Sequence, residues 1–115
     1  MRPFFHPSLD EITIEGVLHA LSDPVRAQIF AQIVTADTPP ICSAFLEVGD
    51  RVVPKSTLSQ HFKILREAGL IRSERKGVEQ LNTARIDELR QRFGGMVDTI
   101  MAAYQARTAN RKAVN

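Results

Sequence analysis

The sequence contains a single cysteine, Cys42, no tryptophan and no long hydrophobic run. One thiol cannot form a disulfide within a chain, which is typical of a protein that folds in a reducing compartment. No apolar stretch approaches the roughly 20 residues that a membrane-spanning helix needs, and the apolar part of the first residues is too short for a secretory signal. We therefore expect a cytoplasmic protein that makes no contact with a membrane.

Acidic and basic residues are unevenly distributed along the 115-residue chain, although the net charge is only +2. Residues 1–50 contain two basic and seven acidic side chains, whereas residues 51–76 contain seven basic and two acidic ones. A central basic segment in a near-neutral domain is typical of a surface that meets phosphates, and an ordinary solvated surface is the alternative. The length allows one domain and leaves no room for a separate catalytic one.

Apolar residues at helical spacing predict most of the secondary structure. The expected helices cover residues 11–21, 24–35, about 41–46, 54–68, and a long terminal stretch that begins at 86. Asp23 before Pro24 is a typical helix start, and Gly69 is a typical left-handed helix end.

A β-hairpin is predicted after the fourth helix. Residues 70–75 and 78–82 flank Lys76-Gly77, which is a two-residue hairpin signal. By strand alternation Ser73 and Arg75 share one face of the hairpin, and Arg72 lies along the domain surface, paired with an acidic residue. The order of elements predicts a mainly α winged helix-turn-helix of about five helices with a two-stranded wing. We expect an N-terminal arm over 1–10, a DNA-binding and dimerisation domain over 11–106 and a polar tail over 107–115.

The predicted helix over 54–68 has two contrasting faces when residues are placed at about 100° intervals. Leu58, Phe62 and Leu65 define a core face, while small hydroxyls, an amide and a cation lie on the outward face. These outward residues are Ser56, Ser59, Gln60 and Lys63. Hydroxyls and amides can hydrogen-bond base edges, and a cation can neutralise a phosphate, so this helix is the expected DNA reader.

Two segments resemble the ArsR/SmtB family of bacterial repressors. The first is Ser22-Asp23-Pro24-Val25-Arg26, and the second, more specific one is STLSQHFKILREAGLI over 56–71. The similarity covers about residues 12–104 and implies a dimeric winged-helix repressor whose DNA affinity is set by an effector. It places DNA contacts at Ser56, Thr57, Ser59, Gln60, His61 and Lys63, with Arg75 and Lys76 at the wing tip. His61 flanks the core face, so a packed imidazole is the alternative there. The turn over 49–55 is longer than the family's usual compact turn.

Metal sensing, which is common in that family, lacks its usual ligands in this sequence. A thiolate site needs several cysteines around one centre, and only Cys42 is present. The terminal helix contains carboxylates but no histidine, so we expect neither a metal nor another cofactor. Cys42 is expected to be a small buried hydrophobe, and a thiol-based redox sensor is the alternative.

The predicted terminal helix carries an apolar seam that a soluble protein must bury. Its members are Leu89, Phe93, Val97, Ile100 and Tyr104. We expect it to form a homodimer interface, with a small-molecule pocket as the alternative. Gly94-Gly95 inside this helix indicates either the close approach of a partner helix or a kink.

No glycine-rich phosphate loop and no recognisable catalytic set occurs in the sequence, so we do not expect an enzyme. The predicted function is a DNA-binding repressor that binds a pseudo-palindromic operator on double-stranded DNA as a homodimer. Its effector, if it has one, is not identifiable. The alternative from a different class is a winged-helix module that binds other proteins.

Overall fold

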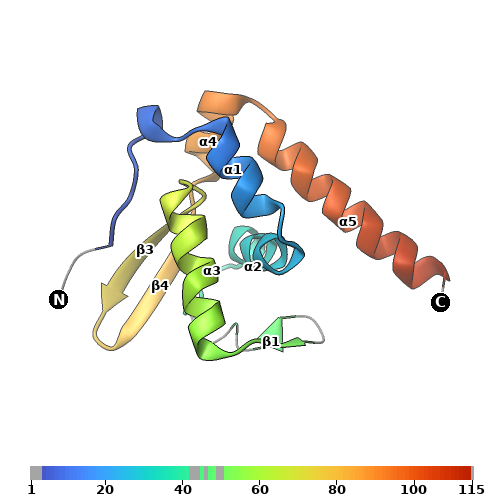
Figure 1. The fold of residues 1–115 in the computed structure, drawn as a ribbon, viewed down its shortest axis with the longest axis horizontal. Coiled ribbons are helices and arrows are strands. Elements are labelled where there is room, and N and C mark those ends of the chain that lie inside the picture. Colours follow the sequence, from blue (N-terminus) through green and yellow to red (C-terminus); the bar gives the residue numbers. More distant parts are fainter. Residues whose placement is uncertain (1–3, 42–44, 46, 49–50, 115) are drawn as a thin grey trace.

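The computed structural model describes residues 4–41, 45, 47–48 and 51–114, with the backbone alone for 47, 48, 51 and 108–114. The described residues include five α-helices, two separate two-stranded hairpins and a 3₁₀ turn, η1, ahead of the first helix. In chain order these are η1 (Leu9–Glu11), α1 (Ile14–Leu21), α2 (Pro24–Thr35), β1 (Glu47–Val48), β2 (Arg51–Val52), α3 (Lys55–Glu67), β3 (Ile71–Lys76), β4 (Glu79–Ala84), α4 (Ile86–Phe93) and α5 (Met96–Val114). The β3–β4 hairpin lies beside α3 (Figure 1). The predicted winged helix-turn-helix is therefore confirmed. No described helix is long and apolar enough to cross a membrane.

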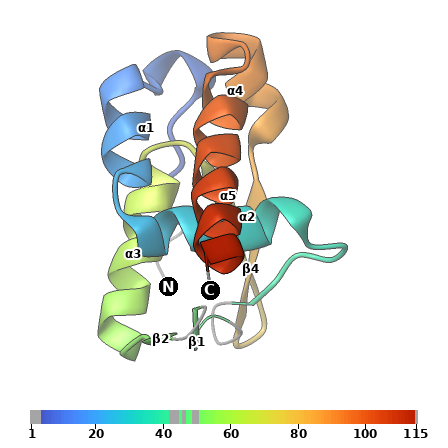
Figure 2. The same ribbon diagram turned by 90° about the vertical axis from the view of Figure 1, so that its right-hand side faces the viewer.

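Helix α2 occupies the centre of the fold, and α1, α3, α5 and β4 pack around it (Figures 1 and 2). Ile29 and Phe30 of α2 are fully buried, as are Phe62 and Leu65 of α3. Each such side chain contributes about 1.5–3 kcal/mol on burial. One side of α3 is thereby fixed against the core, and its opposite side is left on the surface.

The start of α2 is set by local chemistry, as the sequence predicts. Asp23 is the N-cap residue, and its Oδ1 accepts hydrogen bonds from the backbone N–H groups of Val25 (2.8 Å) and Arg26 (3.2 Å). Pro24 follows at the first helical position, where a missing N–H has no consequence.

The end of α3 follows a glycine signal. Gly69 has a φ of 87°, and the N–H of Leu70 donates to the carbonyl of Leu65 at 3.0 Å. This bond closes the last turn of the helix in the manner expected after a left-handed glycine. A Cβ at Gly69 would lie 2.5 Å from the side chain of Ile12, so the position also needs a residue without a side chain.

The wing pairs from Ile71↔Ala84 to Lys76↔Glu79. Its two turn residues are therefore Gly77 and Val78, whereas the sequence analysis placed Lys76-Gly77 at the tip. The prediction is wrong by one residue because Gly77, with a φ of 65°, takes the first turn position. Ile71 and Ser73 are buried and Arg72 is exposed. The faces therefore alternate as predicted, but the face of Ser73, and not that of Arg72, is the one that packs inward.

The first α-helix begins later than the predicted residue 11. Residues 9–11 form a separate 3₁₀ turn, and α1 starts at Ile14. The cause is Thr13, whose Oγ1 accepts a hydrogen bond from the N–H of Gly16 at 3.0 Å and caps a new helix.

Of the predicted short helix over 41–46, the structure describes only Ile41 and Phe45, and Phe45 lies in a 3₁₀ turn. Residues 42–44 and 46 lie outside the described residues. Ile41 forms an isolated bridge with Leu81 of β4, and β1 pairs with β2 in place of the predicted helix end at 48–50. Phe45 is buried, with its ring 5.3 Å from that of Phe62.

The predicted continuous terminal helix is divided in two. Gly94 has a φ of 62°, which ends α4, and α5 begins at Met96. The kink that Gly94-Gly95 indicated as one alternative is therefore present. Helix α5 then leads away from the rest of the fold (Figure 1). Its backbone stays helical to Val114, so most of the predicted polar tail continues this helix.

Candidate nucleic-acid interface

The outward side of α3 is polar and solvent-exposed. Leu58, Phe62 and Leu65 are buried, in agreement with the predicted core face. The exposed side chains at the N-terminal end and on the outer face include Ser56, Thr57, Ser59, Gln60 and Lys63. These groups offer hydroxyls, an amide and a positive charge on one rigid helix, which is 13 residues long. Such a face can hydrogen-bond base edges and contact phosphates.

The wing tip and the N-terminal end of α3 lie at the same end of the molecule in both views (Figures 1 and 2). Arg75 and Lys76, at the end of β3, are both exposed. Glu79 pairs with Lys76 across the hairpin, so the tip carries both signs of charge. The structure thus brings the two predicted cationic positions of the wing to the same end as the helix.

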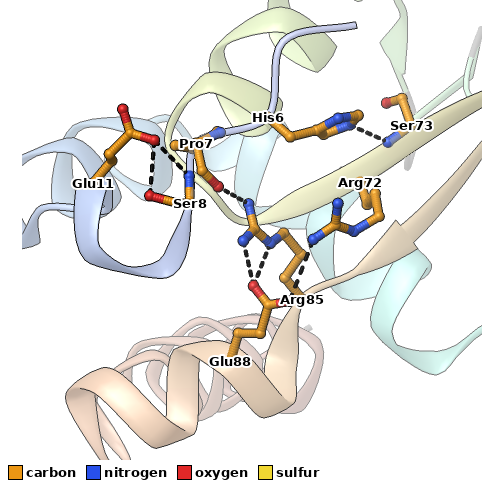
Figure 3. Close-up of polar contacts among 8 residues, drawn as sticks. All are labelled: His6, Pro7, Ser8, Glu11, Arg72, Ser73, Arg85 and Glu88. Carbon is orange, nitrogen blue, oxygen red and sulfur yellow. Dashed lines mark hydrogen bonds and ion pairs between the residues drawn. The ribbon is translucent and has the colours of Figure 1, made fainter.

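Arg72, on the other face of β3, turns toward the domain. Its Nη2 lies 3.3 Å from Oε1 of Glu88, which confirms the predicted pairing with an acidic residue (Figure 3). The buried Arg85 also bonds Glu88, through Nε at 2.8 Å. Hydrogen bonds from Arg85 are the main cause that lowers the pKa of the Glu88 carboxyl. Arg72 is therefore part of the protein's own ion-pair network.

His61 is separated from the exposed side chains of α3. Its side chain is only 8% exposed, and among the described residues its Nδ1 has no hydrogen-bond partner. The sequence analysis gave His61 as a DNA contact with a packed imidazole as the alternative, and the burial of the side chain favours the packed alternative. The reason is geometric, since Leu58 and Leu65, three residues before and four residues after His61, are buried on the same side of the helix.

Comparisons with known proteins agree with this geometry. A family profile described as "Helix-turn-helix domain" matches residues 21–74, which include α2, α3 and most of β3. A solved structure, "ArsR-like Transcriptional Regulator from Rhodococcus sp. RHA1", superposes with a TM-score of 0.56 and 26% sequence identity, covering 87% of this chain and 90% of that one. No curated protein matches the sequence. The chain is a winged helix-turn-helix protein similar to an ArsR-like regulator, and these findings support a DNA-binding transcriptional regulator.

Two members of the predicted dimer seam lie inside the regulator's own core. Leu89 is fully buried and Val97 is 2% exposed, so neither has surface to offer a partner. Phe93 and Ile100 stay partly exposed, and the Tyr104 hydroxyl donates to the backbone carbonyl of Leu21.

Sequence reasoning missed several polar residues that hold the regulator together. Arg26 is 8% exposed and bonds the end of α1, and Asn82 is fully buried. The Oδ1 of Asn82 accepts from Ser73 Oγ at 2.9 Å, and its Nδ2 donates to the Pro40 carbonyl at 3.1 Å. The sequence signal that could have identified these buried residues is a polar side chain among apolar neighbours, on a helix face for Arg26 and within a strand for Asn82. Cys42, expected to be a small buried hydrophobe with redox sensing as the alternative, lies outside the described residues.

The regulator's stability is expected to fall between pH about 7.5 and about 5.5. Burial is the first cause that lowers the pKa of both His6 and His61. Below the unfolded value of 6.5 the unfolded chain binds protons that the folded chain resists, so folding weakens as pH falls. The carboxyls of Asp23 and Glu88 have lowered pKa values and stay ionised in this window. Urea unfolding at both pH values measures the change.

The matched control is the double variant His6→Gln, His61→Gln, which removes both groups from the titration. Its unfolding free energy should depend less on pH than that of the wild type. Equal dependence in the two proteins would show that these histidines do not titrate differently on folding.

Proposed function

We propose that this regulator represses transcription by binding a pseudo-palindromic operator as a homodimer, with α3 in the major groove and the β3–β4 wing beside it. The observation that carries the proposal is the outward face of α3, where five polar side chains stand exposed above a buried apolar face. Nothing large and apolar interrupts that face. A helix of this kind fits the major groove, where every base pair presents a distinct set of donors and acceptors.

Within this proposal, the residues have different tasks. Gln60 is the candidate for base readout, because a side-chain amide can bond both the N6 and N7 positions of adenine. Lys63 is the candidate for a phosphate, to which it brings a positive charge without sequence information. Arg75 and Lys76 reach the backbone or groove beyond the contact made by α3.

Dimerisation places two copies of α3 on successive major grooves, about 34 Å apart. Exposed apolar residues support helices α1 and α5 as the interface, since Ile14 and Leu18 of α1 are each 47% exposed. A dimer on its operator would exclude other proteins from the same DNA, which is the proposed basis of repression. A small effector that changes the dimer's affinity for DNA, and action in the cytoplasm, remain part of this proposal.

Gln60→Ala is expected to weaken binding to the preferred site by about 1–3 kcal/mol and to relax preference at one base pair in each half-site. The amide is exposed on α3, so its loss leaves the fold intact. The measurement is fluorescence anisotropy on a duplex that the wild-type protein selects from a randomised pool, with single-base variants as competitors. Unchanged preference at every position would rule out base reading by Gln60.

Lys63→Ala serves as the contrasting variant in the same assay. It should weaken all duplexes alike and lower the slope of log affinity against log salt by about one unit, as expected for one lost phosphate contact. Gln91→Ala, on the exposed side of α4, is the matched control and should change neither quantity.

A further inference from the structure

The N-terminal arm, residues 4–8, runs along the outer edge of the wing strand β3 and is fastened there (Figures 1 and 3). The backbone N–H of Ser73 donates to Nε2 of His6 at 2.9 Å. The carbonyl of Pro7 accepts from Nη1 of the buried Arg85 at 2.7 Å, and Pro7 is itself buried. Two hydrogen bonds therefore hold the arm to residues more than 60 positions away in the sequence.

This attachment brings the ring of Phe4 to two arginines. The guanidinium carbons of Arg66, near the end of α3, and of Arg75, on the wing, each lie 4.3 Å from the ring centroid. Arg66 Nη1 also donates to Ser73 Oγ at 3.2 Å, so its direction is set by the protein. For Arg75, the Phe4 ring is the contact that the described residues provide.

Stacking and hydrogen bonding use different parts of a guanidinium group. An aromatic ring attracts its flat face, whereas its five N–H donors point outward from the edge in the plane. An arginine that rests on a ring can therefore still bind a phosphate. Stacking on the ring has already restricted the rotamers of that arginine, so the side chain loses less conformational entropy when it binds a phosphate.

We propose that Phe4 is a positioning residue for DNA binding, which holds the guanidinium of Arg75 on the wing in a conformation ready to contact a phosphate of the duplex. This rests on the proposed function, in which Arg75 reaches DNA. Phe4 itself touches no nucleotide. The N-terminal arm is then a working part of the DNA-binding surface, although it lies outside the helix-turn-helix.

The test compares Phe4→Ala with Phe5→Ala, because Phe5 is the adjacent aromatic residue and is 59% exposed. Affinity is measured by fluorescence anisotropy on the duplex that the wild-type protein selects from a randomised pool. Phe4→Ala should bind about three- to fivefold more weakly, the effect of losing an exposed cation–π contact, while Phe5→Ala should bind like the wild type. Phe4→Tyr should restore wild-type affinity, and Phe4→Leu, which has apolar bulk but no ring, should not.

A double-mutant cycle separates positioning from a general effect on folding. Arg75→Ala should weaken binding about five- to thirtyfold, and adding Phe4→Ala to it should have less than about a twofold further effect. Full additivity of the two losses, unchanged binding by Phe4→Ala, or tighter binding because the arm obstructs DNA would each overturn the inference.

Failure of the proposed function gives a different pattern. If the wild-type protein binds no duplex, the proposed function and this inference fall together. If Gln60→Ala and Lys63→Ala weaken binding but neither Arg75→Ala nor Phe4→Ala does, the reading helix stands and the role of the arm is wrong.

Discussion

Replacement of Arg26 by methionine is expected to lower the free energy of unfolding by about 3–5 kcal/mol, the range for losing one partner of a buried charged network. The guanidinium of Arg26 joins the end of α1 to the start of α2. Its Nε donates to the carbonyl of Ala20 at 2.8 Å and its Nη2 to the carbonyl of His19 at 3.1 Å. Both carbonyls belong to the last turn of α1. That of His19 also accepts from the N–H of Ser22 at 3.3 Å, whereas Pro24, four residues after Ala20, has no N–H to donate.

Methionine keeps most of the apolar bulk of the side chain but donates no hydrogen bond. The carbonyl of Ala20 would then be left without a donor in a buried position, which costs about 1–3 kcal/mol by itself. Asp23 would also lose its cation, since its Oδ2 lies 3.7 Å from Nη1 of Arg26. The helix cap that Asp23 forms on α2 would be weakened as a consequence.

Guanidinium chloride unfolding, followed by circular dichroism, measures this loss. The matched control is Arg90→Met, which breaks a bidentate pair with Asp98 (2.9 and 3.1 Å) on the surface, where Arg90 is 54% exposed. Solvent screens that pair, so its removal should have a much smaller effect. An Arg26→Met protein about as stable as Arg90→Met would show that the buried bonds of Arg26 contribute little.

The parts of the fold that are determined by residues close together in the chain could be predicted from the sequence. Asp23 caps α2 because its carboxylate reaches N–H groups two and three residues away, and Gly69 ends α3 because glycine readily adopts the φ of 87° found there. The two faces of α3 follow from the helical repeat alone. Signals of this kind are complete within a few residues, so the fold class and the outward side of α3 follow directly.

Where a choice depended on tertiary contacts, the sequence left it open or led to an error. His61 lies at the border of the two faces of α3, and only its surroundings in the folded protein decide that it is buried. Gly94-Gly95 allowed a kink or a close helix contact, and the positive φ of Gly94 gives the kink. The arm carries no periodic pattern at all. The hydrogen bond between Ser73 and His6 joins residues that are 67 positions apart, so no pattern of neighbouring residues could have predicted it.

A glutamate at Leu18 is expected to convert the proposed dimer into monomers and to reduce operator affinity at least about a hundredfold. Leu18 projects from α1 and is 47% exposed in the single chain, as is Ile14 one turn earlier. Two apolar side chains of this size on one helix face favour a partner that covers them. A charge placed in that interface would have to be desolvated without a counter-charge, which outweighs the apolar contacts that remain.

The large effect on DNA binding follows from linkage between the two half-sites. In a dimer, binding of the first α3 brings the second to its half-site at high effective concentration, which strengthens overall binding by about 10²–10⁴. A monomer loses this gain while each α3 keeps its own contacts. Binding to a single half-site should therefore be similar for the Leu18→Glu variant and the wild type.

Light scattering at micromolar concentration gives the assembly state, and anisotropy on full and half operators gives the affinities. Val34→Glu is the matched control, because Val34 is similarly exposed (40%) near the end of α2 yet lies outside the proposed interface. It should stay dimeric and bind the full operator like the wild type. A Leu18→Glu protein that remains dimeric would place the interface elsewhere. A wild-type protein that scatters as a monomer would instead require each α3 to find its half-site alone, and the affinity for full and half operators would then be nearly equal.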